Sequence, residues 1–93
     1  MKTSQIIAAE SKSAGIAMEA AEQKAIAKDQ SLSLGMTKYT FDDNSVLAVR
    51  DVEFFGFDAD DAGSIRAYSE WLGADIDEAE SEEVERLLEA LEE

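Results

Sequence analysis

Residues 37–49, TKYTFDDNSVLAV, contain the clearest strand pattern in the chain. Tyr39 and Phe41 alternate with polar residues such as Lys38, which is the two-residue period of a β-strand with one buried face. The acidic and polar cluster at residues 42–45 is typical of a turn. An apolar return strand ends the stretch, so the sequence predicts an antiparallel hairpin.

The elements on either side of this hairpin predict an α+β fold. Residues 52–57, VEFFGF, follow a second reversal and are predicted to form a third strand. Residues 4–28 are rich in good helix formers and are predicted to form one helix, followed by a loop at 31–35. Two more helices are predicted at 59–72 and 77–92. The expected order is αβββαα, a three-stranded antiparallel meander with helices on at least one face.

Each predicted helix carries apolar side chains at helical spacing and is expected to bury that face. The stripes are Ile7, Ala14, Met18, Ala21 and Ala25 in the first helix, Ala62, Ile65, Tyr68 and Leu72 in the second, and Val84, Leu87, Leu88 and Leu91 in the third.

Composition narrows the function classes. Residues 1–93 fit one small domain. The chain lacks Cys and His, which excludes disulfides, thiol nucleophiles and the commonest transition-metal ligand. We therefore expect no catalytic residues, no cofactor and no metal. No apolar run approaches the roughly 18 residues of a membrane span, so a soluble, cytoplasmic protein is predicted.

Charge is the most pronounced property of the chain. The net charge is −14, with a net of +1 in residues 1–40 and −15 in residues 41–93. A field of this sign repels nucleic acid and anionic membranes and attracts basic partners. One continuous acidic surface from the second half of the chain is therefore expected to bind a basic partner.

A calcium loop is one alternative use of these acids. In the pattern of an EF-hand loop, Asp58, Asp60 and Gly63 fall at the first, third and sixth positions. The fifth and twelfth positions are Ala62 and Ser69, which supply no carboxylate. The sequence instead favours a helix start, with Asp58 as the N-cap and acids in the first turn that suit the helix dipole.

The last predicted helix carries a row of carboxylates opposite its apolar stripe. Neighbouring carboxylates recur every three or four residues, or about 5 Å along the axis, against about 3.4 Å per charge along one DNA strand. Such a row can stand in for phosphates, although a Glu-rich helix face is most often only a solvated face. The row comprises Glu78, Glu82, Glu85, Glu89, Glu92 and Glu93.

Several strings together resemble a phage-encoded anti-CRISPR family that acts on type I-F complexes. The strings are AIAKDQ (25–30), TKYTFDDNSVL (37–47), DADDAGSI (58–65), WL (71–72) and VERLLEALEE (84–93). The resemblance implies a small αβ inhibitor without enzymatic activity. It further implies that the protein mimics double-stranded DNA in the Lys/Arg-rich, PAM-side cleft of crRNA-guided Cascade, between the Cas8-type large subunit and a Cas7-type backbone subunit.

The resemblance and the helical row together define the expected partner-binding acids. Those within matched motifs are Asp42, Asp43, Asp58, Asp60, Asp61, Glu85, Glu89, Glu92 and Glu93, to which the last helix adds Asp77, Glu78 and Glu82.

Two segments, 31–36 and 73–83, depart from the family pattern and can change affinity or the subtype of complex recognised. Type I-F is the first expectation, and type I-C stays open. A different acidic interaction module, such as an antitoxin-like protein with another basic partner, is the alternative function.

Overall fold

The predicted hairpin lies at the centre of the structure. The computed structural model of the protein describes residues 1–31, 35–73 and 78–92. Strands β2 (Met36–Thr40) and β3 (Ser45–Arg50) pair antiparallel. Asn44 in the turn between them adopts a left-handed backbone with φ of 62°, which Asn tolerates better than most residues. The turn prediction is therefore confirmed.

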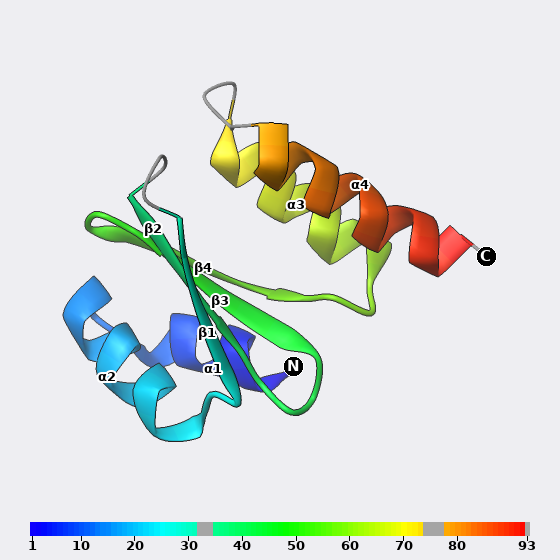
Figure 1. The fold of residues 1–93 in the computed structure, drawn as a ribbon. Helices are drawn as coiled ribbons and strands as arrows, with labels where there is room; N and C mark the ends of the chain where they lie inside the picture. Colours follow the sequence, from blue (N-terminus) through cyan, green and yellow to red (C-terminus); the bar gives the residue numbers. More distant parts are fainter. Residues whose placement is uncertain (32–34, 74–77, 93) are drawn as a thin grey trace.

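The sheet has four strands in the order β1-β2-β3-β4, not the three predicted (Figure 1). Strand β4 (Glu53–Asp58) pairs with β3 as expected, and β1 (Ala27–Ser31) adds a strand on the free side of β2. The prediction missed β1 because its sequence, AKDQS, has no alternating apolar pattern. Backbone pairing with β2 forms this strand without a buried side-chain face.

The single N-terminal helix predicted at 4–28 is wrong. The segment instead forms α1 (Thr3–Glu10) and α2 (Ala14–Lys24). The hydroxyl of Ser13 accepts a hydrogen bond from the N–H of Ile16 at 3.3 Å, which begins a new helix at that point. Good helix propensity on both sides of the break concealed it, and the true order is ααββββαα.

Helices cover both faces of the sheet. Helices α1 and α2 lie on one face, and α3 (Ala62–Leu72) and α4 (Glu78–Glu92) lie on the other (Figure 1). Each face has its own apolar core. The α1/α2 core contains Ile7, Ala17, Ala21, Tyr39, Phe41, Leu47 and Val49, and the α3/α4 core contains Met36, Ala48, Phe57, Ala59, Ile65, Tyr68, Leu72 and Val84.

The predicted apolar stripe of α4 is confirmed except at its end. Val84 is buried, and Leu87 and Leu88 pack against the α3/α4 core. Leu91, predicted to be buried, is 38% exposed. The last turn of α4 runs past the layer beneath it (Figure 1), which agrees with only partial burial at this end of the helix.

Helix α1 packs against β4 at a position where only glycine fits. A Cβ atom at Gly56 would lie 2.3 Å from the backbone oxygen of Ser4. Ser4 is itself fully buried, and its hydroxyl donates to the Phe57 oxygen at 3.0 Å. The N-terminal helix therefore rests directly on the strand backbone.

We expect Gly56→Ala to lower the free energy of unfolding by about 2 kcal/mol or more, because α1 must move off the sheet. Gly63→Ala is the matched control. Gly63 lies in an exposed turn of α3 with only the Asp61 side chain nearby, at 3.7 Å, so the added methyl should be neutral or slightly stabilising. Urea denaturation of both variants checks this, and equal stabilities would contradict the close contact.

Candidate functional site

The outer face of α4 carries most of the exposed carboxylates predicted to bind a partner. Glu78, Glu82, Glu85 and Glu89 are all exposed. The one cation within α4 is Arg86, which forms an ion pair with Glu83. The four exposed carboxylates are therefore not neutralised from within their own helix. Three further predicted acids lie outside what the structure describes, namely Asp77, Glu93 and the side chain of Glu92.

Asp43, in contrast, is held by hydrogen bonds inside the protein. Its Oδ2 accepts from the backbone N–H and the hydroxyl of Thr3 at 2.7 and 2.8 Å. Its Oδ1 accepts from the hydroxyl and the N–H of Ser45 at 2.6 and 3.2 Å. Hydrogen bonds from Ser45 and then from Thr3 hold the pKa of this carboxyl well below its usual range. Asp43 thus fastens the start of α1 to the hairpin turn.

Asp58 and Asp60 both form ion pairs with Lys2, near the N-terminus. The Lys2 ammonium lies 2.9 Å from Asp58 Oδ1 and 2.6 Å from Asp60 Oδ2. Asp60 Oδ1 also accepts from the Asn44 amide at 2.7 Å. The bonds to Asp60 and then Asp58 raise the pKa of Lys2, and the bonds from Lys2 and then Asn44 lower the pKa of Asp60.

The cap of α3 is Asp61, not Asp58 as predicted. The N–H of Ser64 donates to Asp61 Oδ2 at 3.1 Å, and the helix begins at Ala62. Asp58 still belongs to β4, where its own N–H donates to the Ser64 hydroxyl at 2.9 Å. Strand pairing continues to this residue and delays the helix. Asp42 is also a predicted loop acid, and its side chain is exposed. The structure shows no hydrogen bond or ion pair between its carboxylate and another described residue.

A polar cluster that sequence reasoning missed joins α4 to the sheet. Glu80 is only 7% exposed and accepts from the Lys38 ammonium at 3.1 and 2.9 Å and from the Tyr68 hydroxyl at 2.7 Å. Burial, and then the bond to Glu80, raises the pKa of the Tyr68 phenol. The spacing of the sequence could have predicted the burial of Glu80. Glu80 precedes Val84 by one helical turn and therefore lies on the same buried stripe.

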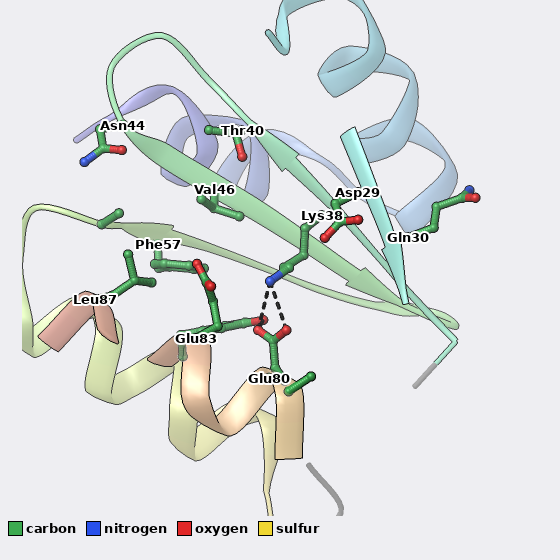
Figure 2. Close-up of a pocket in the computed structure, with 13 residues that line it drawn as sticks. Asp29, Gln30, Lys38, Thr40, Asn44, Val46, Phe57, Glu80, Glu83 and Leu87 are labelled. Atoms are coloured by element: carbon green, nitrogen blue, oxygen red, sulfur yellow. Dashed lines mark hydrogen bonds and ion pairs between the residues drawn. The ribbon is translucent and has the colours of Figure 1, made fainter. Parts of the chain in front are cut away.

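This cluster borders a pocket of about 530 Å³ between α4 and the sheet (Figure 2). Lys38 and Glu80 point toward each other across it, and Glu83 and Leu87 line its α4 side. Asn44 of the hairpin turn lines the same pocket, so the turn and the outer helix border one region.

Among residues 1–31, 35–73 and 78–92, no three carboxylates come together as potential metal ligands. Within the same residues, no helix is long and apolar enough to cross a membrane.

The fold and this surface define a small acidic α+β protein whose main chemical feature is a helix face of exposed carboxylates. A family model described as the anti-CRISPR protein AcrF2 matches residues 6–93. Anti-CRISPR protein 30 of Pseudomonas phage D3112 is 52% identical over 89 residues, which cover 95% of this chain and 99% of that protein. The chain belongs to the AcrF2 anti-CRISPR family.

Acid should weaken the protein through Asp43. Because its folded pKa is lowered, its stabilisation is fully present above the ordinary carboxyl pKa of about 4 and is lost as the pH falls below it. We expect Asp43→Asn to cost about 2 kcal/mol at neutral pH, since bonds to a charged group are lost. The stability of this variant should fall less than that of the wild type between about pH 5 and 2.

Asp42→Asn is the control. It removes the same charge from the neighbouring residue, whose side chain is exposed. Urea midpoints measured against pH for the three proteins separate the local hydrogen bonds from general charge repulsion. If the Asp43 and Asp42 variants gave the same pH profile, the anchoring role of Asp43 would be excluded.

Proposed function

We propose that the protein inhibits a crRNA-guided type I Cascade complex by occupying its duplex-binding cleft in place of DNA. The cleft is the Lys/Arg-rich, PAM-side groove formed by the Cas8-type and Cas7-type subunits. The observation that carries this proposal is the outer face of α4, where four exposed carboxylates, Glu78, Glu82, Glu85 and Glu89, form no ion pair with another residue that the structure describes. The protein acts by occupancy and performs no chemical reaction.

The spacing of these carboxylates supports mimicry of a phosphate backbone. Successive exposed residues lie three or four positions apart, which corresponds to about 4.5–6 Å along the helix. One DNA strand places a charge about every 3.4 Å of its axis. Flexible Lys and Arg side chains can accommodate this difference, and Arg can pair with a carboxylate through two parallel hydrogen bonds.

The remaining predicted acids take a second role in the proposal. Asp43, Asp58, Asp60 and Asp61 use their oxygens for bonds within the protein. They stabilise the scaffold and add to its long-range negative field, which speeds encounter with a basic groove. Direct contacts centre on α4, with Asp77 and Glu92 at its ends and Asp42 on the nearby turn.

Type I-F Cascade is the proposed first target, and type I-C Cascade is the second. The similarity to a Pseudomonas phage anti-CRISPR protein supports production from a phage or mobile element, with action in the cytoplasm of a bacterial host. Binding between charged surfaces should weaken as salt rises, because mobile ions screen the attraction.

We expect Glu85→Lys combined with Glu89→Lys to lower the affinity for type I-F Cascade by at least about 30-fold, since two attractions become repulsions. Both side chains are exposed, and Glu89 lies near the end of α4, where positive charge suits the helix dipole, so the fold should survive. Glu10→Lys with Glu19→Lys is the matched control. It changes the net charge equally, but on exposed residues of α1 and α2, across the sheet.

Purified type I-F and type I-C complexes are titrated with each protein, with and without target duplex, and duplex binding is followed by gel shift. The wild type and the control should block the duplex, and the α4 variant should not. Undiminished blocking by the α4 variant, or simultaneous binding of wild-type protein and duplex, would exclude the proposed mechanism.

A further inference from the structure

Helix α4 is joined to the sheet by polar contacts across a partly open space. On its inner side, Val84 is buried, and Leu87 and Leu88 pack against the α3/α4 core. The space between α4, mainly its first half, and strands β1 to β4 is a pocket of about 530 Å³ (Figure 2). Apolar packing alone therefore does not fix this half of the helix against the sheet.

The Lys38–Glu80–Tyr68 cluster crosses this space. Its members come from β2, α4 and α3, so it ties three elements together. Both carboxylate oxygens of Glu80 contact the Lys38 ammonium, at 3.1 and 2.9 Å, and Oε1 also accepts from Tyr68 at 2.7 Å. The side chains of Lys38 and Glu80 are only 17% and 8% exposed. Removing one partner leaves the other charge buried without its main counterpart, which is costly.

The position of Glu80 on the helix connects this cluster to the outer face. Glu78 and Glu82 each lie two residues from Glu80, or about 200° around the helix. When Glu80 is held inward, these two carboxylates must point outward. A contact with this geometry fixes the rotation of α4 about its own axis. Burial of leucines on a broad apolar face restrains that rotation only loosely.

We propose that the Lys38–Glu80–Tyr68 cluster positions α4 for recognition by fixing its rotation and its height above the sheet. This inference rests on the proposed function. A row of charges that is already aligned in the free protein binds without first ordering the helix. If alignment is lost, the apparent dissociation constant rises in inverse proportion to the fraction of molecules that are still aligned.

Lys38→Met tests the positioning role against a simple charge effect. The variant makes the protein more acidic, so net charge alone predicts equal or tighter binding to a basic cleft. Loss of positioning predicts an affinity for type I-F Cascade that is weaker by about five- to tenfold. The loss should appear in the association rate, with the dissociation rate and the salt dependence unchanged, because the outer carboxylates remain.

Lys28→Met is the matched control, because it removes the same charge from an exposed pair with Glu22 that does not involve α4. Tyr68→Phe is the second variant. It removes one hydroxyl and keeps the aromatic ring, whose centroid lies 4.2 Å from that of the Phe57 ring. It therefore tests the same cluster if Lys38→Met folds poorly. Hydrogen exchange should become about tenfold faster in the amides of α4 for Lys38→Met and Tyr68→Phe, with the central strands unchanged.

The inference is supported if both cluster variants loosen α4 and associate more slowly than Lys28→Met. It is overturned if they bind as fast as Lys28→Met, or if the exchange of α4 is unaltered. Failure of the proposed function gives a different result from failure of this inference. In that case the variant Glu85→Lys with Glu89→Lys would still block duplex DNA.

Discussion

The scarcity of positive charge is the constraint on which this structure depends. Eight lysines and arginines face 22 acidic residues, so each cation that pairs inside the fold is unavailable elsewhere. Lys2 holds Asp58 and Asp60 together, and Lys38 holds Glu80. Arg50 donates to the last two carbonyls of α3 and lies 4.7 Å above the Trp71 ring. These contacts join elements far apart in the sequence, and the outer face of α4 is left negative.

Aspartate and glutamate therefore have two separable roles in this protein. Carboxylates such as Asp43 accept several hydrogen bonds from backbone and hydroxyl groups, which stabilises a charge without any cation. Carboxylates such as Glu85 stand exposed on a helix and are available to a partner. The first kind fastens α1, the hairpin and α3 into a rigid base. That base carries the second kind, which gives the outer face of α4 its negative charge.

The sequence predicted those elements that carry regularly spaced apolar side chains. The stripes of α3 and α4 recur at helical spacing, and Tyr39 and Phe41 of the hairpin alternate with polar residues. Strands β3 and β4 contribute side chains to the cores on both faces of the sheet, so a strict alternation between core and solvent is not required of them. Strand β1 could not be predicted, because pairing with β2 forms it while its side chains at residues 27–30 stay exposed. The helix break before Ala14 depends on a single cap at Ser13, a weak signal inside a strongly helical composition. The buried position of Glu80 was not predicted, because the neighbouring glutamates Glu78 and Glu82 are chemically identical to it and are exposed.

We propose that the outer face of α4 takes the place of DNA phosphates in a basic cleft. A cryo-electron microscopy reconstruction of the protein bound to type I-F Cascade tests it most directly. We expect α4 to lie in the PAM-side duplex groove, with Glu82, Glu85 and Glu89 against lysine or arginine side chains. A complex in which α1 and α2 form the contact, with α4 facing solvent, would contradict it.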